Sequence, residues 1–70
     1  MSEWVFVDSS NIEAIRYLDQ NQELEVRFLS GAIYAYHSVP QEVYEEMLNS
    51  DSKGSYLNRV IKGTYEFSKQ

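Results

Sequence analysis

The clearest pattern in the chain is the strict alternation of apolar and polar residues in "ELEVRFL". Leu24, Val26 and Phe28 fall on one face and the intervening charged residues on the other, as in a strand with one buried face. The preceding "NIEAIRYLD" (residues 11–19) is rich in β-branched and apolar residues, and the following "AIYAYH" resumes the apolar pattern. Because "DQNQ" and Ser-Gly mark turns between these segments, the pattern predicts an antiparallel three-stranded meander.

The second turn decides which way the two tyrosines of "YAY" point. A two-residue loop, Ser30-Gly31, would place both on the polar face, and a shift of one residue places both on the apolar face. We predict the three-residue loop Leu29-Ser30-Gly31, with Gly31 left-handed in a bulge and Phe28 paired with Ala32, because a two-residue turn favours Asn-Gly or Asp-Gly. The apolar face of the sheet then comprises Ile15, Tyr17, Leu24, Val26, Phe28, Tyr34 and Tyr36.

After Val39 the apolar period changes to that of a helix. Pro40 suits the first helical position, where its missing N–H costs nothing. The helix dipole favours Glu42 in the first turn. The apolar stripe of this first helix comprises Pro40, Val43, Tyr44, Met47 and Leu48, and its outer, acidic face comprises Gln41, Glu42, Glu45, Glu46 and Asn49.

A second helix is predicted between Ser52, a favourable N-cap, and Gly63, a favourable C-terminal cap. Two amphipathic helices bury their stripes by packing on one face of the sheet, so the predicted fold class is α+β. The second helix has an apolar side of Tyr56, Leu57, Val60 and Ile61 and a cationic side of Ser55, Asn58, Arg59 and Lys62.

Seventy residues make a single domain. We place it at residues 8–66, after an N-terminal segment 1–7 and before a C-terminal tail 67–70. The run "WVFV" in the first segment predicts either a short edge strand or a cover for the other face of the sheet. A domain of this size needs most of its aromatic residues for its core.

The composition limits the kinds of functional site that the chain can form. The chain has no cysteine and one histidine, so a thiolate zinc site is excluded, and we expect no metal and no cofactor. No stretch resembles a signal peptide or a membrane span, so a reducing cytoplasm is the expected location. His37 next to Ser38, with Ser9, Ser10 and Asp8 elsewhere, supplies the residue types of a catalytic triad, but without nucleophile-elbow spacing. We predict that the protein is not an enzyme.

Charge is unevenly distributed along the chain. The net charge is −5, yet residues 1–51 carry −8 and residues 52–70 carry +3. Such asymmetry favours a surface that meets an anion.

An ordered set of motifs resembles the KTSC domain. The match runs from Val7 to Tyr65, and its centre is the YxY of Tyr34 and Tyr36, followed by Val39-Pro40. The resemblance implies a domain found at the C-terminus of some lysyl-tRNA synthetases and as a small free-standing bacterial protein, for which RNA binding has been suggested. This chain ends with less arginine than similar sequences do. The motif residues with expected structural roles are Tyr17, Phe28, Gly31, Tyr34, Tyr36, Pro40, Tyr56 and Ile61.

Three candidate sites follow. Tyr34 and Tyr36 either stack bases or pack in the core, and we favour the core. At Lys53-Gly54-Ser55, free N–H groups and a cation are the ingredients of an anion site, although capping by Ser52 and close packing at Gly54 are the favoured explanation. The best candidate contact surface for phosphates comprises Ser55, Asn58, Arg59 and Lys62.

We therefore predict a non-enzymatic interaction module, monomeric, that binds RNA or another anion through the second helix. The alternative is a module that binds a protein, or a second copy of itself, through the opposed acidic and basic helices. A third hypothesis, a small ligand near Tyr34 and Tyr36, requires a concave pocket beside them. The Asp8–Asn11 segment is predicted to turn the chain into the first strand through side-chain to backbone hydrogen bonds.

Overall fold

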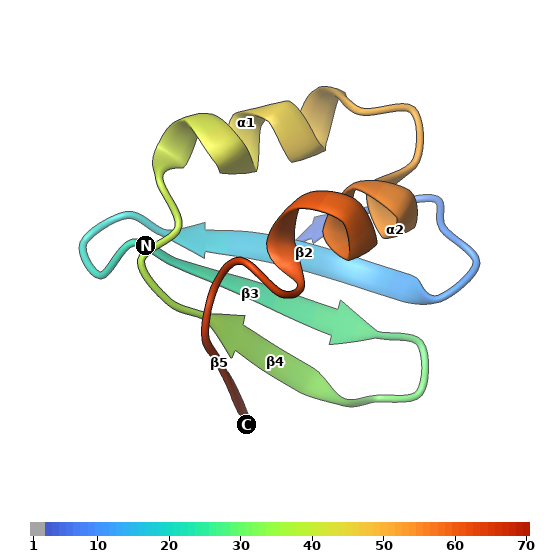
Figure 1. Ribbon diagram of the computed structural model, residues 1–70. Helices are drawn as coiled ribbons and strands as arrows, with labels where there is room; N and C mark the ends of the chain where they lie inside the picture. The colour runs from blue at the N-terminus through green and yellow to red at the C-terminus, as the bar shows by residue number, and fades with distance from the viewer. Residues whose placement is uncertain (1–2) are drawn as a thin grey trace.

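The fold is a five-stranded antiparallel sheet with two helical segments packed on one face (Figure 1). It is seen in a computed structural model that describes residues 3–70. The strands follow one another in chain order across the sheet, so the predicted α+β class and the central meander are confirmed. The elements are β1 (Val5–Phe6), β2 (Ile12–Leu18), β3 (Glu23–Phe28), β4 (Ile33–Tyr36), α1 (Gln41–Asn49), α2 (Lys53–Tyr56), η1 (Leu57–Ile61) and β5 (Phe67–Lys69).

The predicted number of strands was wrong, because the chain adds one strand at each edge of the meander. β1 pairs with β2, Val5 opposite Ile15, so "WVFV" supplies an edge strand; residues 1–2 of the predicted N-terminal segment lie outside the described residues. β5 pairs with β4, Lys69 opposite Tyr34, so residues 67–69 of the predicted tail belong to the sheet. Both added strands are two or three residues long and exposed, too short to show an apolar alternation.

The predicted turn between β3 and β4 is confirmed. Gly31 has φ +98°, and the Phe28 N–H donates to the Ala32 carbonyl at 2.8 Å. Tyr34 therefore lies opposite Val26 and Tyr36 opposite Leu24. Tyr36 is buried, as expected, but Tyr34 is only half-buried and packs at the margin of the core.

The helices begin and end close to the predicted residues. Pro40 is the N-cap of α1 and not its first helical residue, because its ψ of 151° is extended. Ser52 caps α2 as predicted, its Oγ accepting from the Ser55 N–H at 3.2 Å. The predicted second helix is divided: a single α turn leads into the π-helical turn η1, closed by the Lys62 N–H on the Leu57 carbonyl at 2.8 Å.

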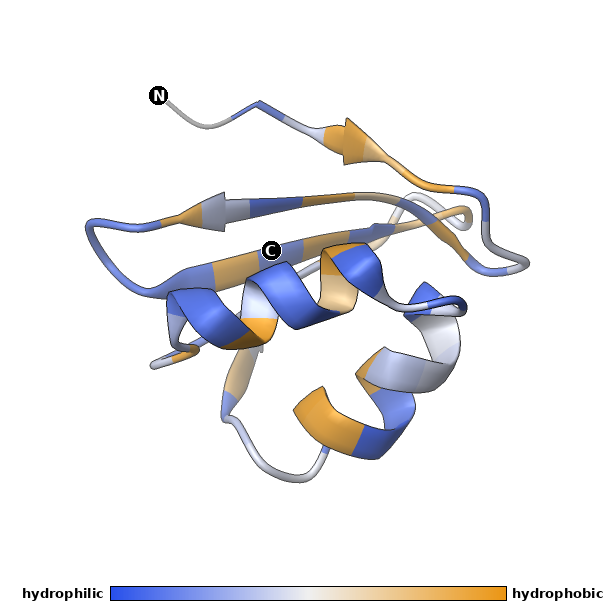
Figure 2. Cartoon of the chain, turned by 90° about the horizontal axis from the view of Figure 1, so that it is seen from above, coloured by the Kyte–Doolittle hydropathy of each residue, from blue (hydrophilic) through white to orange (hydrophobic). Residues whose placement is uncertain are grey.

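The core lies between the helices and the sheet. Hydrophobic and hydrophilic residues are interspersed along the central strands, whereas β1 is hydrophobic throughout (Figure 2). The hydrophobic residues of β2–β4 meet Met47 of α1 and the buried side of α2 and η1. The Tyr17 hydroxyl, inside this layer, donates to the Val39 carbonyl at 2.6 Å. The fully packed residues are Ile12, Ile15, Tyr17, Leu24, Val26, Tyr36, Val39, Met47, Tyr56, Leu57 and Ile61.

Candidate ligand-binding groove

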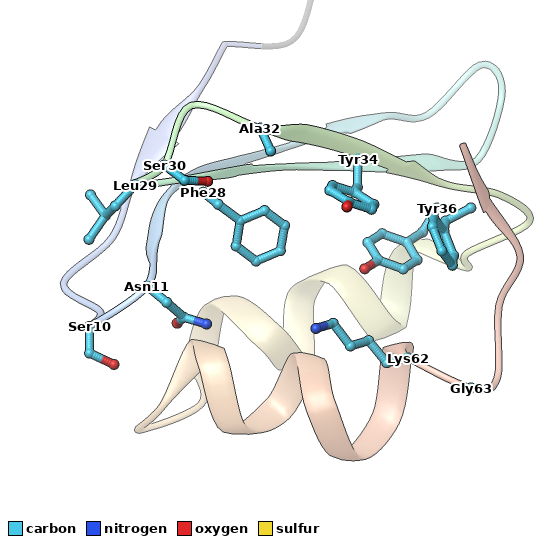
Figure 3. A pocket seen from close by; sticks show the side chains of 11 residues that line it. Ser10, Asn11, Phe28, Leu29, Ser30, Ala32, Tyr34, Tyr36, Lys62 and Gly63 are labelled. Atoms are coloured by element: carbon cyan, nitrogen blue, oxygen red, sulfur yellow. The ribbon is translucent and has the colours of Figure 1, made fainter. Parts of the chain in front are cut away.

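An open groove of about 710 Å³ lies between the sheet and the C-terminal end of η1 (Figure 3). It supplies the concave pocket that a small-ligand hypothesis required beside Tyr34 and Tyr36. Its volume falls within the range of ligand pockets, about 300–1,000 Å³. It is lined by Ser10, Asn11, Phe28, Leu29, Ser30, Ala32, Tyr34, Tyr36, Lys62, Gly63 and Phe67.

Four aromatic rings from three strands form a continuous row along the groove. Phe28 of β3 meets Tyr34 of β4 edge to face, with ring centroids 5.6 Å apart. Phe67 of β5 then lies 5.3 Å from Tyr34 and 5.6 Å from Tyr36. These side chains share one face of the sheet because partners in an antiparallel pair point the same way. Phe67 is 56% exposed, so the row is open to solvent at this ring.

Among the described residues that line the groove, Lys62 is the only cation. Lys62 follows η1 directly, and its Nζ lies 5.8 Å from the centroid of the Phe28 ring. Figure 3 shows its ammonium group in the space between Phe28 and Tyr36. Burial, and secondarily the neighbouring Tyr34, raise the pKa of Tyr36 above its ordinary value, so its hydroxyl is neutral at physiological pH. The groove therefore combines an aromatic wall, one positive charge and neutral polar groups.

The predicted anion site at the start of α2 is occupied by structural contacts. The Lys53 Nζ donates to the Ser50 carbonyl at 3.0 Å, and the Ser55 N–H is used by the Ser52 cap. A Cβ on Gly54 would come within 3.0 Å of the Asn11 Oδ1, so glycine here permits close packing against the loop before β2. These contacts match the capping and packing explanation.

The predicted phosphate-binding face is divided between two hollows. Ser55, Asn58 and Arg59 border a polar hollow of about 530 Å³ that also contains Asp8 and Asp51, and the Arg59 Nε donates to the Ser55 Oγ at 3.3 Å. Lys62 lines the aromatic groove instead. The structure thus brings Lys62 together with residues of β3–β5 and leaves Arg59 beside two carboxylates.

The loop before β2 is organised by Ser9. Its Oγ accepts from the N–H groups of Asn11 and Ile12 at 3.4 and 3.3 Å and donates to the Asn11 Oδ1 at 3.2 Å. The predicted side-chain to backbone turn is confirmed. It also holds Asn11 at the groove, opposite Lys62 in Figure 3.

His37 contacts other residues than those the sequence suggested. Its Nδ1 lies 3.0 Å from the Glu23 Oε2 and its Nε2 3.0 Å from the Ser68 Oγ, whereas Ser38 and Asp8 are not its hydrogen-bond partners. Alternation along the strands places these three side chains on the sheet face opposite Tyr36 and the helices. The side chains of His37 and Glu23 are 36% and 26% exposed, and these contacts tie β5 to β3 and β4.

Residues 3–70 include no group of three or more His, Cys, Asp or Glu side chains placed to hold a metal ion. Among the same residues, no helix has the length and apolar character needed to cross a membrane.

Phe67, Leu29 and Asn11 are groove residues that the sequence did not identify as such. Phe67 stands in a segment expected to be a tail, and nothing local indicates that it meets Tyr34 and Tyr36, about thirty residues earlier in the chain. An exposed aromatic residue in a polar tail was the one available signal.

The molecule is thus a small α+β domain with an aromatic groove at one end of its helical layer. The KTSC domain profile matches residues 8–65, and the chain belongs to the KTSC domain family. An uncharacterised protein of Stutzerimonas stutzeri is 43% identical over 58 residues, covering 83% of this chain and 82% of that protein. A KTSC domain protein of Yersinia pestis, solved as a crystal structure, has a TM-score of 0.95 at 31% identity and covers 100% of this chain and 99% of its own.

The chain also resembles part of a larger protein. A lysine–tRNA ligase of Nostoc is 43% identical over 60 residues, which are 86% of this chain but only 11% of the ligase. The similarity therefore concerns one small region of that ligase.

Proposed function

We propose that this KTSC domain is a non-enzymatic module that binds RNA, with the aromatic groove and Lys62 at the centre of the contact surface. The observation that carries the proposal is the row of four rings beside a single ammonium group. Proteins that bind single-stranded nucleic acid combine a cationic groove with aromatic side chains on which bases stack. The proposal moves the contact from the outer side of the second helix to the groove.

Two further facts support RNA as the ligand. Lysine–tRNA ligases of Nostoc and Trichormus, whose name gives tRNA as a substrate, carry a region similar to this chain. The C-terminal third, which contains Lys62, Phe67 and Lys69, is also the one positively charged part of the sequence. Its charge is small, so we expect weak binding that falls as salt is added.

Protein binding or self-association is the second candidate. The outer side of α1 exposes Glu42 and Glu45 and the outer side of η1 exposes Arg59, and opposed charged faces of this kind suit a partner with complementary charges. Sedimentation of the free protein over a hundredfold concentration range tests self-association, for which we expect a monomer. A mass that rises with concentration would favour this candidate.

The test of the proposal is an amide-resolved NMR titration with bulk tRNA and a short single-stranded RNA at low salt, repeated at higher salt. We expect shifts at Lys62, Gly63 and Phe67 that diminish as salt rises. The side chain of Trp4, which lies against Arg16 and Arg27 on the opposite sheet face, provides the internal control. The absence of any shift with either RNA at low salt would rule the proposal out.

A further inference from the structure

We infer that the groove holds one unpaired base, together with the phosphate attached to its nucleotide. This inference rests on the proposed function and specifies it, because it makes the ligand a single-stranded nucleotide and excludes a double helix. It is carried by three features of the groove: the packing of its rings, its size, and the position of its one cation.

The packing of the rings determines where a base fits. Neighbouring rings in the row already contact each other, with centroids 5.3 to 5.6 Å apart, so no base enters between them. A base instead lies against the open side of the row. Phe67 is the exposed ring of the row, at 56%, and Leu29, 58% exposed, adds apolar surface to the groove lining. Such exposed apolar residues clustered around one hollow are typical of a binding surface.

The size and charge of the groove indicate one nucleotide. A volume of about 710 Å³ accommodates a base with its sugar, and the ammonium of Lys62 matches one phosphate. The ammonium projects from the helical side of the groove, across from Phe28 on the sheet (Figure 3). A nucleotide with its base on the rings and its phosphate at Lys62 would therefore span the groove from sheet to helix.

Neutral polar groups are available for the edge of the base. Asn11 presents an amide at one end of the groove, and Ser10 and Ser30 add exposed hydroxyl groups to its lining (Figure 3), whereas Tyr36 is 1% exposed and lies at the floor. An amide and a hydroxyl both donate and accept hydrogen bonds. An A-form duplex keeps its base faces stacked and its deep groove closed to side chains, whereas unpaired nucleotides expose both face and edge. The groove thus suits a loop or an end of an RNA.

The experiment compares four ligands on the intact chain: a labelled single-stranded hexamer, a blunt RNA duplex of the same composition, AMP, and adenosine without phosphate. We expect the hexamer to bind at least tenfold more tightly than the duplex, and AMP more tightly than adenosine. The Phe28, Tyr34 and Tyr36 ring signals should shift with the hexamer and with AMP, whereas the Trp4 indole signal stays in place.

Variants locate the contact. Phe67→Ala should weaken hexamer binding by about 5- to 150-fold, the effect of losing one stacking ring. Phe6→Ala, at an aromatic residue that is 66% exposed on the other edge of the sheet, should leave hexamer binding unchanged. Lys62→Met should reduce the slope of log affinity against log salt by about 0.7, the value for one phosphate on a single strand. Arg27→Gln on the opposite face is its charge-matched control.

The outcomes separate this inference from the proposed function. If the hexamer binds but Arg59→Gln weakens it and Phe67→Ala does not, RNA binding stands and the groove inference is wrong. Equal affinity for the hexamer and the duplex would also mean that RNA binding stands and that the groove inference is wrong. If AMP shifts the ring signals and no RNA binds, the groove inference stands and the proposed function is wrong. No binding by any of the four ligands refutes both. Thermal unfolding of each variant confirms that it is folded.

Discussion

At the scale of single residues, two tyrosines of the core, Tyr17 and Tyr56, satisfy their hydroxyl groups within the protein. The Tyr17 hydroxyl donates to a backbone carbonyl, and the Tyr56 hydroxyl donates to the Glu46 Oε1 at 2.7 Å. Tyr56 is 7% exposed, so an unpaired hydroxyl there would be costly. The second bond connects α2 to α1 and helps to fix the two helices relative to each other.

Tyr56→Phe should lower the free energy of unfolding by about 1 kcal/mol at neutral pH, because the variant keeps the ring and loses the bond to an exposed carboxylate. Urea unfolding followed by circular dichroism measures the loss. Tyr65→Phe, at a less buried tyrosine near the end of the helical layer, is the matched control and should change stability less. Equal stability of Tyr56→Phe and the parent chain would show that the bond contributes nothing net.

The same residue predicts a dependence on alkaline pH. Burial, followed by the hydrogen bond and the charge of Glu46, raises the pKa of Tyr56 to about 12. A proton that is held more tightly in the folded state stabilises the fold fully below the ordinary pKa of 10, and that contribution is lost as pH rises from 10 to about 12. The stability advantage of the parent over Tyr56→Phe should therefore shrink across this range. A constant difference would contradict the raised pKa.

At the scale of elements, the sequence predicted what local patterns determine. The alternation in "ELEVRFL" and the position of Gly31 were enough for the register of β3 and β4. The prediction of the buried side of the second helix was also correct. Tyr56, Leu57 and Ile61 stay on that side, because a single π-helical turn rotates the later residues only slightly relative to an α-helix. β5 could not be predicted, because its three exposed residues are held by pairing to β4 and by Phe67 on Tyr34, contacts that no local pattern encodes.

The packing of α2 against the loop before β2 gives a prediction at this scale. Gly54→Ala would normally stabilise a helix, by up to about 1 kcal/mol. Here the added Cβ meets the Asn11 Oδ1 at 3.0 Å and the Ser9 Oγ at 3.4 Å. The two oxygen atoms are joined by a hydrogen bond. We expect a net destabilisation of about 1 kcal/mol in chemical denaturation, because the turn must shift to admit the methyl group.

A double-mutant cycle identifies the cause. In an Asn11→Ala background the nearest obstacle to the Cβ is gone, so Gly54→Ala should become neutral or stabilising there. The coupling energy between the two substitutions then measures the free-energy cost of placing a Cβ against the Asn11 side chain. Additive effects of the two substitutions would show that Gly54 has some role other than close packing against Asn11.

At the scale of the whole molecule, the candidate site was the least predictable feature. The groove joins Asn11, Phe28, Tyr34, Lys62 and Phe67, which come from five separate segments. Sequence spacing identified a cationic helix side, but the distances between segments are set by tertiary packing. The sequence spacing grouped Lys62 with Arg59, whereas in the folded protein the two residues line different hollows.

The distribution of charge over the molecule limits the RNA it accepts. The chain carries −5 overall, and the outer side of α1 is acidic, so a long polyanion that reaches past the groove meets repulsion. Exposed charges act over about 10 Å at 0.1 M salt. We therefore expect affinity to gain little as a single strand is lengthened from three nucleotides to about twenty, unlike the steep gain for a protein with an extended basic surface.

Neutralising the acidic side of α1 tests this directly. Glu42→Gln with Glu45→Gln removes two exposed carboxylates and leaves Glu46, the partner of Tyr56, in place. At low salt the double variant should bind a twenty-nucleotide strand several-fold more tightly and a trinucleotide nearly unchanged, and the gain should disappear at high salt because the repulsion is screened. Fluorescence anisotropy with both labelled strands measures the effect. An equal gain for the trinucleotide would mean that α1 lies within reach of the groove ligand itself, and that the acidic side acts on the bound nucleotide and not on the flanking strand.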